Sequence, residues 1–285
     1  MSVRASLAAA TAELAAAGIA SPRTDAELLA AHALGIARGR LVMVDDFTPE
    51  QLAVFRHLLA DRSKRVPLQH LVGTVSFGEI DIAVGPGAFV PRPETELMLV
   101  WGLTKLPGDA SVVVDLCSGT GAIALAVAHA RPQARVIAVE RDPGTATWLR
   151  RNAKTRIVAG DRAIEVIVGD VTDPHVPPTS LDGAVDLLLC NPPYVPDGTA
   201  VPDEVLHDPY AAVFGGPDGL DVIKPVVTRA VTLLKSGGWL AIEHDDSHVH
   251  AVADLLVATN SVTEIEVHRD LAGRPRFTTA HRMAD

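Results

Sequence analysis

Apolar runs rich in β-branched residues alternate with helical stretches from about residue 93 to the end of the sequence. We expect these runs to be strands, at 111–115, 135–139, 163–168, 184–190, 238–243, 262–268 and 275–280. Strands separated by helices indicate βαβ units, which build a mostly parallel, doubly wound sheet. Only a short turn that contains Gly273 separates the last two runs, so these two strands should pair antiparallel. Such a sheet binds its ligands at the carboxyl ends of its strands.

The chain before this region has a different pattern. Residues 1–72 carry leucines at helical spacing among many alanines, which predicts a small helical domain without chemistry of its own. Within it, Thr24 or Asp25 should cap one helix, because both are good N-cap residues after a glycine-containing break. Thr48-Pro49-Glu50 should start another helix, with proline at the first helical position.

Between the two regions, residues 74–84 alternate apolar and polar side chains, which predicts a β-hairpin. Gly85-Pro86-Gly87 ends this pattern. We therefore divide the chain into a helical domain at 1–72, which we expect to recognise a substrate, a hairpin linker at 73–92, and an α/β domain at 93–285.

The composition limits the classes of function. Of the 285 residues, 48% are hydrophobic, which is enough for a sizeable core and excludes a mainly disordered chain. The net charge of -10, from 25 basic and 35 acidic residues, disfavours a nucleic-acid partner, since such proteins usually carry a basic surface. The sequence contains no run of about 18 apolar residues, so we expect no membrane span. Two cysteines, Cys117 and Cys190, are typical of a protein of the reducing cytoplasm.

A glycine-containing turn follows the first expected strand, which ends near Asp115. Gly119 and Gly121 would let the backbone turn tightly and approach a ligand, and their spacing also fits the loose dinucleotide pattern. An acid at the strand end, however, repels a pyrophosphate and suits the cationic amino-acid end of S-adenosylmethionine (SAM). The alternative for Asp115 is a turn-capping role. The candidate cofactor-binding residues here are Asp115, Cys117, Ser118, Gly119, Thr120 and Gly121.

The next two strands also end at acids. Glu140 follows the second strand, where a carboxylate can accept hydrogen bonds from both ribose hydroxyls, a device that NAD and SAM sites share. Asp170 follows the third strand and could bind the adenine amino group, with Val171 packed against the ring. The alternatives are a solvated loop acid for Glu140 and a helix N-cap for Asp170. The successive order of Asp115, Glu140 and Asp170 favours a cofactor site.

The sharpest motif is Asn191-Pro192-Pro193-Tyr194, directly after an apolar run that reads as a buried strand. Two prolines stiffen the loop and remove two backbone donors, which leaves carbonyl groups as acceptors beside the Asn191 side-chain oxygen. Such acceptors suit a substrate with a planar NH2 group, whose nitrogen would face the methyl group of SAM. The Tyr194 ring offers a face for stacking. A rigid surface turn is the alternative for the tetrapeptide in isolation.

Further segments along the chain, together with this loop, resemble the HemK/PrmC protein-glutamine methyltransferases, which modify class 1 peptide chain release factors. The resemblance covers nearly the whole length. The segments that carry it are Pro67–Gly73, Phe89-Val-Pro91-Arg92-Pro93-Glu94-Thr95-Glu96, Asn191–Tyr194, Asp208-Pro209, Gly215–Asp221 and Gly237–Glu243.

This resemblance implies the fold and the chemistry. The fold would be a Rossmann-like SAM-dependent methyltransferase domain with a seven-stranded, mostly parallel sheet and an antiparallel last strand. The reaction would move a methyl group from SAM to the glutamine side-chain amide of a Gly-Gly-Gln motif. Asn191, Pro192 and Tyr194 would be catalytic, and Asn191 would also line the SAM site. The substrate glutamine would meet Phe89, Arg92, Thr95, Asn191, Pro192, Pro193 and Tyr194, with Glu96 helping to shape the pocket.

Two positions depart from the family pattern. Cys117 stands where a glycine is usual, and we expect a turn conformation there that is compatible with a side chain. Val171 stands where some relatives carry an aromatic residue. Two neighbouring functions remain open: glutamine methylation of a ribosomal protein, and methylation of an exocyclic amine of a nucleic acid, which in a duplex requires base flipping. A nicotinamide-dependent enzyme is disfavoured by Asp115 and by the Asn191 loop.

Overall fold

The computed structural model describes residues 1–106, 108 and 110–284. They form two compact units. The first contains Met1–Thr74 and, far away in the sequence, Val201–His207. The second contains Val75–Ala200 and Asp208–Asp285. The chain therefore passes from one unit to the other three times.

The first unit is helical, as the leucine spacing predicts. Its elements are α1 (Val3–Ala16), α2 (Pro22–Leu34), a 3-10 helix (Arg38–Met43), α3 (Pro49–Ser63) and α4 (Leu68–Val72). A capping box starts α3 as expected, because the Thr48 hydroxyl accepts from the Gln51 backbone N–H and the Gln51 side chain accepts from the Thr48 N–H. The predicted cap of α2 is wrong: this helix begins at Pro22, after Ser21.

Asp25 does not cap α2 but forms an ion pair inside the unit. Arg62 is buried, and its guanidinium contacts the Asp25 carboxylate at 2.7 Å and the Glu204 carboxylate at 2.8 Å. Asp25 thus lies in the first turn of α2, where a negative charge is favourable, and serves Arg62 instead of capping the helix. The contact with Glu204 fixes the segment 201–207 to the helical unit.

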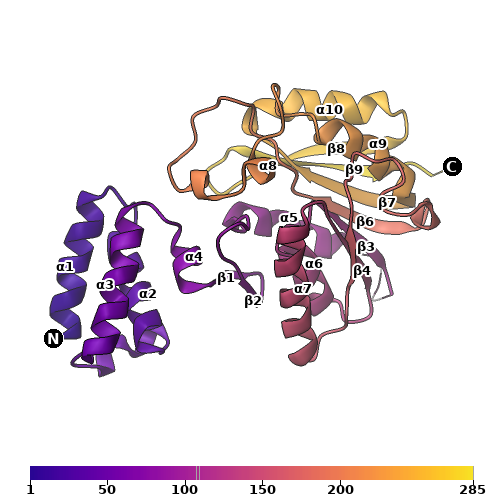
Figure 1. Cartoon of the computed structure of the whole chain (residues 1–285). Coiled ribbons are helices and arrows are strands. Elements are labelled where there is room, and N and C mark those ends of the chain that lie inside the picture. The colour runs from indigo at the N-terminus through magenta and orange to yellow at the C-terminus, as the bar shows by residue number, and fades with distance from the viewer. Residues whose placement is uncertain (107, 109, 285) are drawn as a thin grey trace. The chain divides into compact units, whose positions relative to one another are not determined.

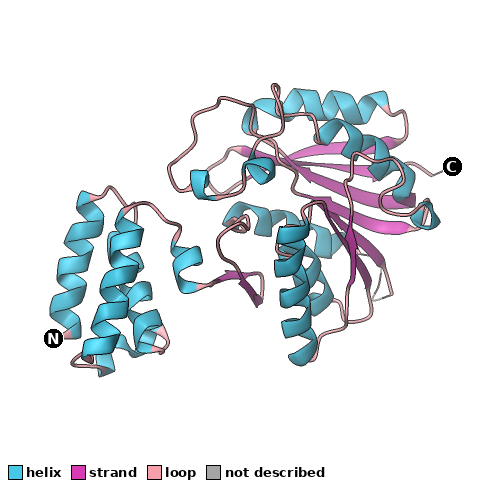
Figure 2. Cartoon of the chain, in the orientation of Figure 1, coloured by secondary structure: helices cyan, strands magenta, loops and turns pink. Residues whose placement is uncertain are grey.

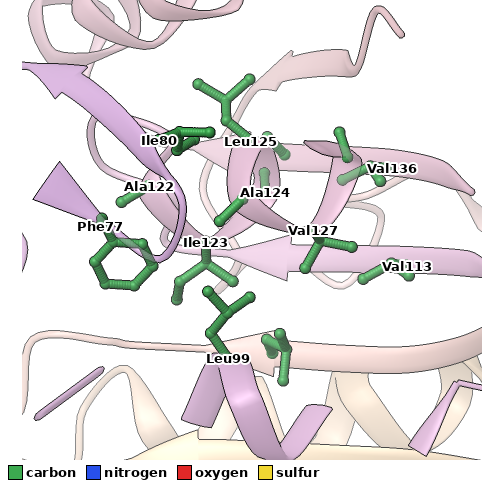
Figure 3. Packing of buried hydrophobic residues seen from close by; sticks show 14 of the residues in the cluster. Phe77, Ile80, Leu99, Val113, Ala122, Ile123, Ala124, Leu125, Val127 and Val136 are labelled. Atoms are coloured by element: carbon green, nitrogen blue, oxygen red, sulfur yellow. The ribbon is translucent and has the colours of Figure 1, made fainter. Parts of the chain in front are cut away.

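The second unit begins within a hairpin formed by β1 (Thr74–Phe77) and β2 (Ile80–Ala83), as expected. Figure 3 shows Phe77 and Ile80 of the hairpin gathered with Ala122 and Ile123 in one buried cluster. The Asn152 side chain accepts from the Ala83 backbone N–H and donates to the Ala83 carbonyl, each at 3.0 Å. The hairpin is therefore part of the second unit's core.

A seven-stranded sheet forms the centre of this unit, in the order β5-β4-β3-β6-β7-β9-β8. β9 is antiparallel to both of its neighbours, and the pairs from β5 to β7 are parallel. This confirms the mostly parallel sheet with an antiparallel last strand. The strands are β3 (Val112–Leu116), β4 (Arg135–Glu140), β5 (Glu165–Val168), β6 (Val185–Cys190), β7 (Leu234–Glu243), β8 (Val262–Arg269) and β9 (Pro275–Arg282).

Helices cover both faces of the sheet (Figures 1 and 2). On one face lie α5 (Pro93–Lys105), α6 (Ala122–Ala130) and α7 (Pro143–Val158); on the other lie α9 (Ile223–Leu233) and α10 (Val249–Ala258). The short α8 (Tyr210–Val213) and 3-10 helices at Thr179–Leu181 and Asp246–His248 also belong to this unit, whereas the 3-10 helix at Val205–His207 belongs to the first. β6 serves both faces, because Leu187 and Leu189 join one core whereas Leu188 and Cys190 join the other.

The sheet register brings the ends of four strands to one level. Leu116 of β3 pairs with Val139 of β4 on one side and with Cys190 of β6 on the other, and Cys190 pairs with Ile242 of β7. The residues that follow these four positions are Cys117, Glu140, Asn191 and Glu243, and they therefore lie along one edge of the sheet. Among the described residues, none of the helices has the length and apolar character that a membrane crossing requires.

Candidate active site

The turn between β3 and α6 has left-handed backbone at alternate positions. Cys117, Gly119 and Gly121 have φ of 60°, 56° and 88°. For Cys117 this corrects our expectation, because a left-handed conformation is unfavourable for a residue with a Cβ atom. The Ser118 backbone N–H donates to the Val139 carbonyl at 2.9 Å, which ties the turn to the end of β4 and helps to hold this conformation.

Asp115 is a buried carboxylate beneath this turn. Its Oδ2 accepts from the Ala124 backbone N–H at 3.2 Å, near the start of α6. Its Oδ1 is buried and has no hydrogen-bond partner among the described residues, and the same holds for the Thr120 hydroxyl in the turn. Burial, together with the charge of Glu140, raises the pKa of Asp115 to about 7. An orphan acceptor of this kind is stabilised by a cationic donor.

Glu140 closes β4 and connects it to the turn. One of its carboxylate oxygens accepts from the Gly119 backbone N–H at 2.9 Å, and the other accepts from the Asp142 N–H at 2.7 Å. Burial raises the pKa of Glu140, although these bonds favour its ionised form. The carboxylate is therefore fixed in place, and each oxygen has a second lone pair for a hydroxyl donor.

Asp170 follows β5 but does not cap a helix, so that alternative is wrong. Its Oδ1 accepts from the Thr172 backbone N–H at 2.9 Å and from the Thr172 hydroxyl at 2.8 Å, which makes a side-chain-stabilised turn. The guanidinium of Arg141 lies 3.6 Å from its other oxygen. Val171 is buried in the core beneath α9 and α10.

The loop 191–194 leaves the end of β6 and is held by a second turn, at 213–219. The Val195 backbone N–H donates to the Val213 carbonyl, and the Gly215 N–H donates to the Val195 carbonyl. A Cβ atom on Gly215 would lie 2.5 Å from the Pro193 carbonyl oxygen, and one on Gly219 would lie 2.3 Å from that of Tyr194. Glycine is required at both positions because the two backbones approach so closely.

The side chains of the loop form a hydrogen-bonded network with α5 and β7. The Asn191 amide Nδ2 donates to the Thr95 hydroxyl oxygen at 3.2 Å, and the Thr95 hydroxyl donates to one oxygen of Glu243 at 2.8 Å. The Tyr194 hydroxyl donates to the other oxygen of Glu243 at 3.1 Å. One buried carboxylate at the end of β7 thus organises both Asn191 and Tyr194.

Burial and the polar neighbours of Glu243 have opposite effects on its pKa. Glu243 is 1% exposed, and burial raises its pKa to about 7, although the bonds from Thr95 and Tyr194 and the charge of Arg276 on β9 favour the ionised form. Burial and the Glu243 charge also raise the pKa of Tyr194, so its phenol stays protonated as a donor. The network therefore has a defined direction, with both hydroxyls pointing toward the carboxylate.

Phe89 and Arg92 form a third part of the site. The Arg92 guanidinium lies over the Phe89 ring, 5.1 Å from its centroid, and pairs with the buried Asp208 carboxylate. Asp208 also accepts from the Val90 backbone N–H at 3.2 Å. The segment 89–92 is consequently fixed to the residue that opens the stretch leading to α8. Glu96 lies further along α5 and is partly buried.

The predicted residues thus fall into connected groups. Asp115 and Glu140 both contact the segment from the glycine turn to the start of α6, and Phe89 contacts Arg92. Asn191 is connected to Glu243 through Thr95, and Tyr194 is bonded to Glu243 directly. Sequence reasoning assigned no role to Glu243 or Asp208. The signal for Glu243 was present, because it ends an apolar strand as Asp115, Glu140 and Asp170 do.

Comparisons with known proteins identify the family. Residues 5–73 match the PrmC N-terminal domain, and residues 95–210 match the methyltransferase small domain. A release factor glutamine methyltransferase of Mycolicibacterium smegmatis is 54% identical over 99% of this chain and 98% of its own length. The chain belongs to the release factor glutamine methyltransferase family.

Further relatives agree with this family. A release factor glutamine methyltransferase of Mycobacterium tuberculosis is 45% identical over 99% of this chain and 92% of its own length. The crystal structure of a methyltransferase from Pyrococcus furiosus matches 79% of this chain and 100% of its own, with a TM-score of 0.54 and 15% identity, which shows a shared fold. Among the described residues, no group of three or more His, Cys, Asp or Glu side chains could hold a metal ion.

Proposed function

We propose that this chain transfers a methyl group from SAM to the side-chain amide nitrogen of the glutamine in the Gly-Gly-Gln motif of class 1 peptide chain release factors. The observation that carries the proposal is the match, over 99% of the chain, to relatives named for this activity. Since translation termination takes place in the cytoplasm, the reaction would take place there too.

The residues at the glycine turn fit SAM. The orphan Oδ1 of Asp115 would meet the cationic amino-acid end, and the fixed carboxylate of Glu140 would accept from the ribose hydroxyls. The backbone from Cys117 to Gly121, including Ser118 and Thr120, would line the amino-acid part. Asp170 and Val171 would lie at the adenine end, with Asp170 as the acceptor. SAM supplies an electrophilic methyl group when it is bound.

The loop 191–194 would hold the glutamine amide by acceptors only. The Asn191 Oδ1 and the Pro192 carbonyl would take the two N–H bonds, while the buried Pro193 keeps the loop rigid. Tyr194 is anchored by its hydroxyl, so its ring would stay in one orientation beside the planar amide. These contacts align the amide nitrogen for an in-line attack, which is a proximity effect. After alkylation the nitrogen loses one proton to solvent, so no strong base is required.

The segment 89–96 would contact the side chain of the incoming glutamine and its neighbours. Arg92 pairs with Asp208 and lies over the Phe89 ring, and Thr95 lies against Asn191. We propose that the helical unit recognises the body of the release factor. Deletion of residues 1–72 should leave S-adenosylhomocysteine binding intact and impair methylation of the intact factor; equal activity on the whole factor would contradict this role.

The test of the function is methyl transfer from labelled SAM to a purified release factor, followed by mass spectrometry of the tryptic peptide that contains Gly-Gly-Gln. We expect one added methyl group on the glutamine, and no label on a factor whose acceptor is changed from Gln to Asn. Equal labelling of that variant would refute the proposal. Transfer to ribosomes instead would indicate a ribosomal-protein substrate, and transfer to DNA or RNA would indicate a nucleic-acid amine.

A further inference from the structure

Glu243 is a buried acid at the carboxyl end of β7 that the proposed methyl transfer does not use directly. It is 1% exposed, and both of its oxygens are occupied by hydroxyl donors, from Thr95 at 2.8 Å and from Tyr194 at 3.1 Å. Thr95 is also buried, and its oxygen is the acceptor for the Asn191 amide at 3.2 Å. A chain of two hydrogen bonds therefore runs from the carboxylate to Asn191.

The direction of this chain follows from the chemistry of its first member. An ionised carboxylate accepts hydrogen bonds and cannot donate them, so the single hydroxyl proton of Thr95 points at Glu243. The Thr95 oxygen then has only lone pairs left, and it requires a donor from its second partner. That donor is the NH2 group of Asn191. The carbonyl oxygen of the same amide, Oδ1, is therefore turned away from Thr95.

This direction matters because the two ends of an asparagine amide have opposite hydrogen-bonding character. With Oδ1 turned away from Thr95, Asn191 offers an acceptor; after a flip of the amide it would offer a donor. A substrate NH2 group requires the acceptor, and a second NH2 group facing it would repel it. A buried polar network that is fully satisfied holds one such arrangement against its alternative.

We propose that Glu243 and Thr95 are positioning residues that fix the Asn191 amide with its carbonyl oxygen toward the substrate NH2 group. This inference rests on the proposed function for the identity of the substrate amide. Neither residue has to touch the substrate, because both act through Asn191. The second oxygen of Glu243 fixes Tyr194 in the same way, so one carboxylate orients both ends of the loop.

The charged groups around Glu243 have opposite effects on the ionisation of its carboxyl group. Arg276 on β9 favours its charge, whereas Glu94 on α5 opposes it. Cys190 on β6 and Tyr194 also lie within its electrostatic influence. Burial raises the pKa of Glu243 to about 7, so the carboxylate keeps its direction-setting charge at pH 8 and loses it below pH 6.

The first test removes Thr95, the middle member of the hydrogen bonds that connect Glu243 to Asn191. Thr95→Val keeps the volume and removes the hydroxyl, so we expect kcat to fall on the order of 100-fold, as for a misplaced reacting group. The dissociation constant for S-adenosylhomocysteine should change less than about twofold, because the cofactor residues are untouched. Thr95→Ser restores the hydroxyl and should recover most of the activity that Thr95→Val loses. A Thr95→Val enzyme with wild-type kcat would overturn the proposal.

The second test asks whether Glu243 acts on Asn191 through Thr95. In Glu243→Gln one carboxamide oxygen replaces two acceptors, so the Thr95 and Tyr194 hydroxyls compete for it and the fixed direction is lost. We expect kcat to fall roughly 10-fold alone and by a clearly smaller factor when the change is added to Thr95→Val, because only the contact with Tyr194 then remains to be lost and residues on one path are not additive. Equal effects of Glu243→Gln in both backgrounds would refute the relay, by which we mean the hydrogen bonds from Glu243 through Thr95 to Asn191. Glu266→Gln, an exposed acid on β8, is the matched control.

A third measurement does not depend on the reaction. In NMR spectra of the whole protein, the Asn191 side-chain NH2 signals, assigned by their absence in Asn191→Asp, should exchange slowly with solvent in the wild type and rapidly in Thr95→Val. Equal exchange rates would overturn the relay whatever the substrate is. Failure of the wild-type enzyme to methylate release factors, with slow exchange intact, would refute the proposed function and leave the relay standing.

Discussion

The change Asp115→Asn should make the ligand-free protein more stable and less able to bind its cofactor. In the folded chain, burial raises the pKa of Asp115 to about 7, against an ordinary value of 3.8. A group whose pKa is raised on folding contributes stability at low pH and loses it as pH rises through the folded pKa. At pH 8 the carboxylate is therefore ionised in a place that disfavours its charge.

The magnitude follows from the pH interval. Each pKa unit corresponds to about 1.4 kcal/mol, so the two units between pH 5 and pH 7 remove roughly 3 kcal/mol of stability that Asp115 contributes in its neutral form. An asparagine does not titrate. The free energy of unfolding of Asp115→Asn, minus that of the wild type, should accordingly be about 3 kcal/mol larger at pH 8 than at pH 5. Glu243 titrates in both proteins, so its contribution cancels in this difference.

The assay is urea unfolding followed by far-ultraviolet circular dichroism at the two pH values, without ligand. Asp254→Asn, at an exposed position of α10, is the control and should show no such change. In calorimetry, Asp115→Asn should bind S-adenosylhomocysteine roughly 10- to 100-fold more weakly, because a charged hydrogen bond contributes about 1.5–3 kcal/mol. The reasoning is refuted if the variant has the same pH dependence of stability as the wild type.

Two further variants test other features. Cys117 has φ of 60°, so Cys117→Val should lower the free energy of unfolding by about 2 kcal/mol, because a branched Cβ is strained there, whereas Cys117→Gly should stay within about 1 kcal/mol of the wild type; equal stabilities in thermal unfolding would contradict the strain. Arg62→Met leaves Asp25 buried without its partner and should destabilise the helical unit by about 3–5 kcal/mol. Arg23→Met, in an exposed pair, should cost below about 1 kcal/mol in the same urea titration.

Much of the fold could be predicted from periodicity. Every strand expected after residue 93 is present, the central ones buried and the edge strands β5 and β8 only partly so. The order of Asp115, Glu140 and Asn191 along the chain also predicted their common edge, since parallel strands end on the same side of the sheet.

The errors have a common physical cause, which is that tertiary contacts override local preference. Asp25 is a good capping residue, yet it pairs with Arg62, which lies 37 positions away. Cys117 adopts a conformation that its own side chain disfavours, because the turn is bonded to β4. Glu243 becomes informative only when the sheet register places it beside Thr95, which lies 148 positions away in the sequence. Local sequence cannot encode such partners.

The attachment of residues 201–207 to the helical unit affects how the protein can be taken apart. A protease that cut the chain once in the β1–β2 hairpin would leave two pieces still held together, because Glu204 would remain paired with Arg62. The same applies to chimaeras. Exchanging residues 1–74 with those of a relative would separate Arg62 from Glu204, so a working hybrid must carry the distant segment along.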